Sequence, residues 1–232
     1  MLANCDTSFL LRKTYLHEAI IPRKLYAKVQ EELLRRANLH SGKDRKKILL
    51  VDCGVKNNII RCLIERGAEV IRVPWDYDFN QIEFDGLFLA NGPGDPNTCE
   101  KTVENIRKFM GAPEIKPCMG ICMGNQLISK AAGANIYKLK YGHRSHNQPV
   151  RRVGTEQCFI TSQNHGYAVD SSTLPKDWEE LFVNMNDGSN EGVRHKHNPW
   201  FSAQFHPEDC GGPLDTEFLF DYYLNLINQT GK

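Results

Sequence analysis

A cysteine between two glycines, in Gly120-Ile121-Cys122-Met123-Gly124, is the part of this sequence best suited to nucleophilic chemistry. The glycines allow a sharp turn from a strand predicted over 117–121 into a helix, and they leave the approach to the sulfur open. The N-terminal end of that helix carries a partial positive charge, which favours the reactive thiolate. Glycine-rich turns after strands also have purely structural roles, so Cys122 needs partners before it indicates catalysis.

A second candidate group is Gln204-Phe205-His206-Pro207-Glu208, at the end of a strand predicted over 200–205. Residues two apart in an extended chain face the same side, so His206 and Glu208 can lie together. A carboxylate beside an imidazole orients the ring and stabilises the imidazolium that forms when the ring takes a thiol proton. An isolated pair of this kind is more often a surface ion pair, but together with Cys122 it predicts a catalytic triad.

A third motif, Asn91-Gly92-Pro93-Gly94-Asp95-Pro96, directly follows a strand predicted over 84–90. Its composition would also suit an ordinary turn. If it serves catalysis, a rigid glycine-proline loop can hold the N–H of Gly94 against the oxyanion that forms during attack, with the N–H of Met123 as the second donor. Both loops follow the carboxyl ends of strands, which is where open α/β sheets bind ligands.

The elements that must position these motifs alternate between strand and helix from residue 47 onward. This alternation predicts an α/β fold with an open, mostly parallel sheet flanked by helices. We expect early strands over 47–52, 68–73, 84–90 and 117–121, with helices over 57–66, 99–110 and from Met123. We expect later strands over 158–162, 181–185 and 200–205, added to the same sheet before a closing helix over 214–227.

Composition is that of a folded globular protein: 41% of the 232 residues are hydrophobic, 25% are charged and the net charge is +1. These values exclude wholesale disorder and collagen-like fibres. The sequence has neither an apolar run long enough to span a membrane nor a secretory signal pattern. Eight scattered cysteines without a C-x-x-C pair predict free thiols and a cytoplasmic location.

We expect no metal site in this chain. His143 and His146 lie close together in the sequence, but no third ligand follows at a suitable spacing, so hydrogen bonding within a loop is the more plausible role for both.

The sequence of residues 1–46 predicts a basic helical appendage or linker, separate from the domain over 47–232. An amphipathic helix is expected over 22–39, followed by a charged linker. Residues 15–46 are similar to a linker segment of large serine recombinases, and an unrelated basic helix explains them equally well. A DNA-binding role for this segment is disfavoured, because the rest of the chain has no basic excess.

Four motifs in this order resemble the class I, or triad, glutamine amidotransferases: GPGDP at 92–96, GICMGNQ at 120–126, TSQNHGYAVD at 161–170 and FHPE at 205–208. Two further stretches, DCGVKNN at 52–58 and GHRSHNQPV at 142–150, narrow the similarity to the small, glutaminase subunit of carbamoyl phosphate synthase. The resemblance covers residues 47–229. Full-length small subunits also carry a separate N-terminal domain, so truncation, fusion and a natural short form all stay open for residues 1–46.

The resemblance implies a flavodoxin-like core and the hydrolysis of L-glutamine to glutamate and ammonia through a cysteinyl thioester. Cys122 would be the nucleophile, His206 the base and Glu208 its orienting partner. Family positions around the bound glutamine correspond to Gly92, Gly94, Met123, Gln126, Asn164, Gly166 and Tyr167. Ammonia would pass to the large subunit of carbamoyl phosphate synthase, for arginine or pyrimidine synthesis. ATP is expected only on that partner, so this chain would need no cofactor.

Two alternatives remain open at this point. The same fold serves amidotransferases of anthranilate, GMP and CTP synthesis, which differ in the partner that consumes ammonia. The second alternative is that the chain is a truncated, weakly active remnant with a binding or regulatory role. In that case Cys122 would not react selectively with a glutamine-like electrophile.

Overall fold

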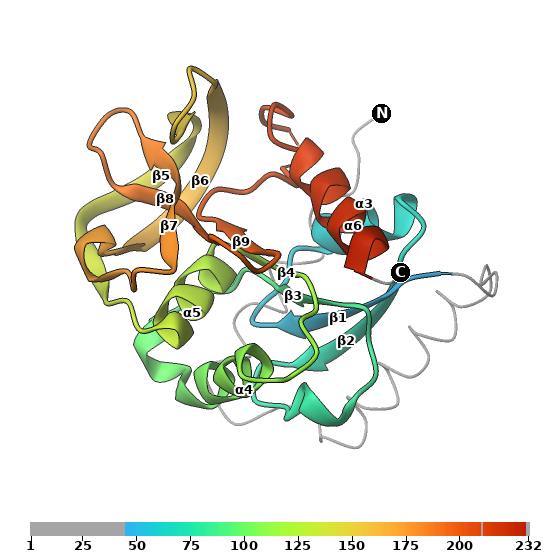
Figure 1. Ribbon diagram of the computed structural model, residues 1–232. Helices are drawn as coiled ribbons and strands as arrows, with labels where there is room; N and C mark the ends of the chain where they lie inside the picture. Colours follow the sequence, from blue (N-terminus) through green and yellow to red (C-terminus); the bar gives the residue numbers. More distant parts are fainter. Residues whose placement is uncertain (1–44, 210, 231–232) are drawn as a thin grey trace, which may run out of the picture. The chain divides into compact units, whose positions relative to one another are not determined.

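The structure is a computed structural model that describes residues 45–209 and 211–230 (Figure 1). The helix expected over 22–39 lies outside the described residues, so the basic appendage and its boundary at Lys46 stay predictions. The first described strand begins at Lys47, as expected. None of the described helices is long and apolar enough to cross a membrane.

Five strands form the parallel half of the sheet, in the order β2-β1-β3-β4-β9. Their bounds are β1 (Lys47–Asp52), β2 (Glu69–Pro74), β3 (Gly86–Leu89), β4 (Cys118–Ile121) and β9 (Trp200–Ala203). The strands β3, β4 and β9 are buried along their whole length. Such runs are typical of parallel sheets that are covered on both faces.

Two pairs of helices cover this half of the sheet. They are α3 (Asn57–Glu65) with α6 (Phe218–Thr230), and α4 (Glu100–Met110) with α5 (Met123–Ala132). Alternate residues of β1 belong to two separate apolar cores: Ile48 and Leu50 pack with α3 and α6, whereas Leu49 and Val51 pack with α4 and α5. The two helix pairs therefore lie on opposite faces, and the predicted flavodoxin-like α/β core is confirmed.

Four further strands continue the sheet beyond β9 in the order β8-β7-β5-β6, and each neighbouring pair here is antiparallel. Their bounds are β5 (Ile136–Arg152), β6 (Cys158–Val169), β7 (Trp178–Asn184) and β8 (Asn190–His195). Figure 1 shows them as a separate group of yellow and orange ribbons beside the parallel strands. The nine-stranded sheet is therefore mixed, parallel at one end and antiparallel at the other. Short 3-10 helices occupy Phe79–Gln81, Pro96–Thr98 and Ser171–Thr173.

The expected strands and helices are all present. Most lie within a few residues of their predicted bounds, but β6 continues to Val169, well beyond the predicted end at 162, and β5 and β8 were not predicted. β5 is mostly polar and has one fully buried residue, Val150. It also contains Gly142 and Pro149, which normally end strands. Its pairing with β6 shifts register twice, so the sequence lacks the regular alternation that reveals a strand.

Pairing in the parallel half brings the three motifs to one edge of the sheet. Leu89 at the end of β3 is the partner of Gly120 in β4, and Ile121 is the partner of Ala203 in β9. The loops that follow these strands carry Gly94, Cys122 and His206. All three loops therefore start from the carboxyl edge, where the sequence placed the ligand.

Candidate active site

Cys122 occupies a strained turn between β4 and α5. Its φ of 54° and ψ of −101° make it the one non-glycine with positive φ among the described residues. Side chains rarely adopt such angles, and residues that do so concentrate at functional sites. The N–H of Cys122 donates to the carbonyl of Ala203 at 2.8 Å, which fixes the turn against β9.

The flanking glycines are required by close packing of the backbone. A Cβ atom on Gly124 would lie 2.1 Å from the carbonyl oxygen of Leu89, and one on Gly120 would lie 2.6 Å from the carbonyl oxygen of Gly124. The first turn of α5 is thus pressed against the end of β3. This packing places the helix N-terminus beside the thiol, as the sequence predicted.

His206 and Glu208 form the expected pair. The Nδ1 atom of His206 lies 2.7 Å from Oε1 of Glu208, and both side chains are buried. The backbone N–H of His206 donates to the carbonyl of Ser162 in β6 at 2.9 Å. Because Nδ1 faces the carboxylate, Nε2 is the ring atom left to exchange a proton with the thiol.

Charges around His206 favour its protonated form. Burial alone would lower the pKa of His206, but the charges and hydrogen bonds of Glu208 and Cys122 more than reverse this, and the pKa is raised to about 10. Burial likewise opposes ionisation of Glu208, yet the adjacent His206 and the more distant Lys56 leave the pKa of that carboxyl below its usual value. The site therefore suits an imidazolium that lies between the Cys122 sulfur and the Glu208 carboxylate.

Two residues that hold Glu208 were missed by the sequence analysis as site residues. The Nζ atom of Lys56 lies 3.5 Å from Oε1 of Glu208, and the side-chain amide of Asn58 donates to the backbone carbonyl of Glu208. Both belong to the DCGVKNN stretch, which was noted only for its resemblance. A lysine after a strand that ends at the same sheet edge was the available signal.

The Gly-Pro loop that follows β3 is tightly constrained at one glycine and open at the other. A Cβ atom on Gly92 would lie 2.0 Å from the carbonyl oxygen of Cys53, whereas one on Gly94 would meet nothing within 4 Å. Gly94 has a φ of 103°, in the region that favours glycine. Met123 is the first residue of α5, where N–H groups lack intrahelical acceptors. Gly94 thus adopts a conformation that favours glycine, and the N–H of Met123 belongs to the first turn of α5.

Contacts between Gln126, Tyr167 and Asp95 join the segments expected to bind glutamine. The amide of Gln126 donates to the carbonyl of Tyr167 at 3.0 Å and to Oε1 of Gln204 at 3.1 Å. The side chain of Tyr167 bonds to that of Asp95 in the Gly-Pro loop. The amide nitrogen of Gln126 is therefore used within the protein, where it links α5 to β6.

A polar cavity of about 350 Å³ adjoins His206. Asn164 is exposed on β6 and lines this cavity, together with Lys56 and Arg144. Gly166, two residues along β6, is half-buried, and a Cβ atom there would have Arg144 as its nearest contact, at 3.6 Å. The structure thus places Asn164 with His206 at one cavity, and it places Gln126 and Tyr167 in contact with each other.

Comparisons with known proteins point to one family. The family model described as glutamine amidotransferase class-I matches residues 49–226. The arginine-specific small chain of carbamoyl phosphate synthase from Saccharomyces cerevisiae is 54% identical over 193 residues, which are 81% of this chain and 47% of the yeast protein. The multifunctional protein pyrABCN from Emericella nidulans is 56% identical over 187 residues, 79% of this chain and 8% of that protein. The chain therefore spans about half the length, or far less, of these relatives.

Solved structures share the fold. A candidate GMP synthase protein from Thermoplasma acidophilum has a TM-score of 0.70 at 24% identity, covering 81% of this chain and 96% of that one. A glutamine amidotransferase from Thermotoga maritima has a TM-score of 0.59 at 17% identity, covering 81% of this chain and 86% of that one.

Proposed function

The chain belongs to the class I glutamine amidotransferases, and from that premise we propose that it hydrolyses L-glutamine to glutamate and ammonia. Cys122 is the nucleophile, His206 the general acid and base, and Glu208 the residue that orients His206. The catalytic domain spans residues 47–232. The observation that carries the proposal is the contact of His206 with Glu208 on one side and Cys122 on the other, at a strained cysteine turn.

In the first half of the reaction, His206 holds the proton of the Cys122 thiol while the sulfur attacks the side-chain carboxamide carbon of glutamine. A carbon–sulfur bond forms and the carbonyl electron pair moves to oxygen. The N–H groups of Gly94 and Met123 stabilise this oxyanion. Collapse of the intermediate breaks the carbon–nitrogen bond, and the proton on His206 leaves with the amine as ammonia.

In the second half, water attacks the glutamyl thioester and gives a proton to His206. The carbon–sulfur bond breaks, glutamate leaves, and the thiolate and imidazolium are restored. Glu208 holds Nδ1 throughout, so that Nε2 stays directed at the reacting atoms. Each step uses groups of this chain alone, and the proposed reaction needs neither a metal nor a cofactor.

A trapping experiment tests this chemistry directly. The chain is mixed with labelled L-glutamine, quenched in acid and digested, and we expect a glutamyl adduct on the peptide that contains Cys122. Cys122→Ser is expected to lose the thioester and to lower glutamate release by at least about 10³-fold. Cys158→Ser is the matched control, since Cys158 is exposed at the start of β6. Unchanged glutamate release by Cys122→Ser would refute the assignment.

For the fate of the ammonia, we propose delivery to the large subunit of a carbamoyl phosphate synthase. The yeast relative supports this partner, because it is a small chain of that enzyme and is 54% identical to this chain. The GMP synthase-like structure supports only the fold, at 24% identity. Carbamoyl phosphate synthase is therefore favoured over anthranilate, GMP and CTP synthesis.

Reconstitution with ATP and such a large subunit tests the partner. Glutamine-dependent formation of carbamoyl phosphate is expected from the parent chain and is expected to disappear in Cys122→Ala. Synthesis from added ammonium salt is expected to persist in both mixtures, because it bypasses Cys122. A parent chain that hydrolyses glutamine but never supports carbamoyl phosphate formation would refute the partner and leave the hydrolase intact.

A further inference from the structure

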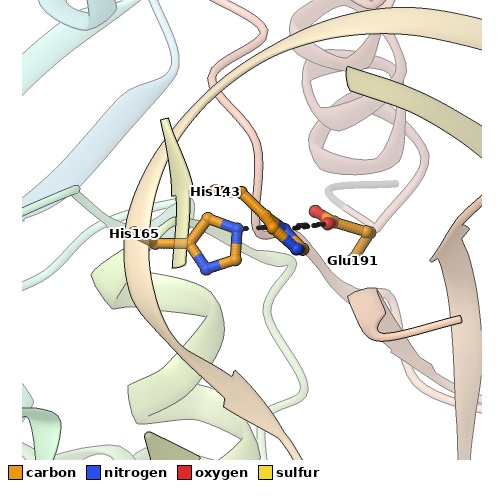
Figure 2. A group of neighbouring side chains, drawn as sticks. All are labelled: His143, His165 and Glu191. Atoms are coloured by element: carbon orange, nitrogen blue, oxygen red, sulfur yellow. Dashed lines mark hydrogen bonds and ion pairs between the residues drawn. The ribbon is translucent and has the colours of Figure 1, made fainter. Parts of the chain in front are cut away.

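A second cluster of chemically capable side chains lies in the antiparallel half of the sheet. His143 on β5 and His165 on β6 are direct cross-strand partners, and Glu191 projects toward them from β8. The nearest ligand atoms of the three residues all lie within 4.8 Å of one another. Figure 2 shows the three side chains converging.

Each histidine is held by its outer nitrogen in a way that presents the other nitrogen to the cluster. Nδ1 of His165 lies 2.8 Å from the carbonyl oxygen of Tyr167, so it carries a proton and leaves Nε2 with its lone pair. Nε2 of His143 lies 3.0 Å from the carboxylate of Asp187, which leaves Nδ1 facing inward. Outer partners of this kind fix the ring orientation of metal-binding histidines.

The carboxylate oxygen of Glu191 lies near the inward nitrogen of each histidine. Oε1 of Glu191 lies 3.2 Å from Nδ1 of His143 and 3.9 Å from Nε2 of His165. Ligands about 2.0 to 2.2 Å from a tetrahedral ion lie about 3.3 to 3.6 Å apart, so an ion fits among these atoms after small movements.

The cluster contains a buried carboxylate oxygen without a close partner. Glu191 is fully buried, and its Oε2 atom has no hydrogen-bond partner among the described residues. Nε2 of His165 lies 3.1 Å from the side-chain amide of Gln163. A cation among these atoms would supply a partner for Oε2.

A β-bulge directs Glu191 into the cluster. Phe182 in β7 pairs with Gly192 and the next residue, Val183, pairs with Asn190, so Glu191 is the extra residue in β8. Bulges change the direction of a side chain and are frequent beside functional sites. The bulge thus turns the Glu191 carboxylate toward His143 and His165, and no lysine or arginine is among its contacts in the described part of the chain.

We propose that His143, His165 and Glu191 bind one divalent transition-metal ion, with zinc the ion that the ligand set fits best. Two imidazoles and one carboxylate are a ligand set that zinc adopts, with a fourth position for water or for Gln163. The ion would link β5, β6 and β8. If the proposed glutaminase function holds, it would also fix the β6 segment that carries Asn164 and Gly166, the neighbours of His165.

Sequence spacing had paired His143 with His146, and the structure separates them. Nδ1 of His146 instead contacts Ser162 and Asp209 at the cavity beside His206. His146 therefore serves as a matched control, because it is a histidine on the same strand that lies outside the cluster.

Cobalt(II) is a suitable probe, because its spectrum distinguishes binding at this site from binding at the cysteines. The full chain is freed of metal with a chelator and titrated with cobalt(II). We expect one equivalent to bind, with the visible d–d bands of a tetrahedral nitrogen and oxygen site and without a cobalt–thiolate charge-transfer band. Competition with zinc should remove the bands, and zinc should raise the unfolding temperature. A parent chain that shows no such bands, or only a thiolate band, overturns the proposal.

Variants assign the ligands independently of any enzyme activity. His143→Asn and Glu191→Gln, which nearly preserve side-chain size, are expected to weaken binding by at least about 100-fold. Asp187→Asn, which removes an outer partner, should weaken it by about tenfold. His146→Asn should bind as the parent does. Equal binding by the parent and the Glu191→Gln variant overturns the site. A parent chain that binds no metal, because a doubly protonated His143 bridges Asp187 and Glu191, overturns it as well.

Discussion

The Nδ1 atom of His206 lies 2.7 Å from Oε1 of Glu208, and both side chains are at most 3% exposed. Burial makes this contact matter, because a carboxylate without a charged partner would be costly in such a place. The carboxylate both orients the imidazole and stabilises its protonated form. Removing its charge therefore tests orientation and electrostatics together.

Glu208→Gln is expected to lower kcat for glutamine hydrolysis by about 10³- to 10⁴-fold, the scale seen when a triad loses its carboxylate but keeps its shape. KM should change little, because Glu208 is not expected to touch glutamine. Steady-state glutamate release measures both constants. Glu179→Gln, at a half-buried glutamate on β7 that pairs with Arg194, is the control. A kcat for Glu208→Gln within a few-fold of the parent would contradict the assigned role.

The raised pKa of His206 also predicts how stability depends on pH. A histidine whose folded pKa lies near 10 rather than 6.5 stabilises the fold fully below pH 6.5, and that contribution is lost as pH rises from 6.5 to about 10. Urea unfolding across this range should show the decline. In Glu208→Gln the decline should be smaller, because the main charge that raises the pKa is gone. An equal decline in both proteins would argue against the coupling.

Much of the catalytic arrangement could be predicted from the sequence because its signals are local. Cys122 lies between glycines that tight backbone packing requires, and His206 and Glu208 are two residues apart on an extended segment. The buried apolar runs of the parallel strands are equally plain. These features follow from short-range geometry, so the strand bounds at 47–52 and the turn at Cys122 agree closely with the structure.

Features that depend on distant residues were not predictable in this way. Lys56 reaches Glu208 from a distant part of the sequence because β1 and β9 end at the same sheet edge. His143 and His165 meet because β5 pairs with β6 through register shifts, and Glu191 comes to them from β8 at a bulge in its pairing with β7. Polar, half-exposed strands of this kind carry little periodicity, so neither the strands nor their side-chain contacts are visible before folding.

Gly92 and Gly94 are expected to respond differently to alanine. In Gly92→Ala the new Cβ would lie 2.0 Å from the carbonyl oxygen of Cys53, so the loop must move and glutaminase activity should be lost. In Gly94→Ala there is open space, and the cost is the φ of 103°, about 1–2 kcal/mol of unfolding free energy. Urea unfolding and glutamate release measure the two effects. A Gly92→Ala protein with normal activity would contradict the packing argument.

Gln126→Leu tests the contact between α5 and β6. The substitution removes donors to the carbonyl of Tyr167 and to Oε1 of Gln204, and leaves both acceptors without this partner. The unfolding free energy should fall by about 1–3 kcal/mol, and KM for glutamine should rise because β6 carries predicted binding residues. Gln157→Leu, at an exposed turn, is the control. Unchanged stability and KM would show that this contact does not position the segment.

Lys56→Gln tests the charge beside the triad. The Nζ atom lies 3.5 Å from Oε1 of Glu208, and this positive charge helps to keep the pKa of that carboxyl low. Without it the carboxylate protonates more easily, so the acidic limb of the activity profile should move to higher pH. The change in kcat near neutral pH should be only about two- to fivefold, because a partly exposed ion pair contributes about 1 kcal/mol or less. Lys101→Gln, at an exposed position on α4, should leave the profile unchanged. An acidic limb that moves to lower pH in Lys56→Gln would mean that Lys56 does not act through Glu208.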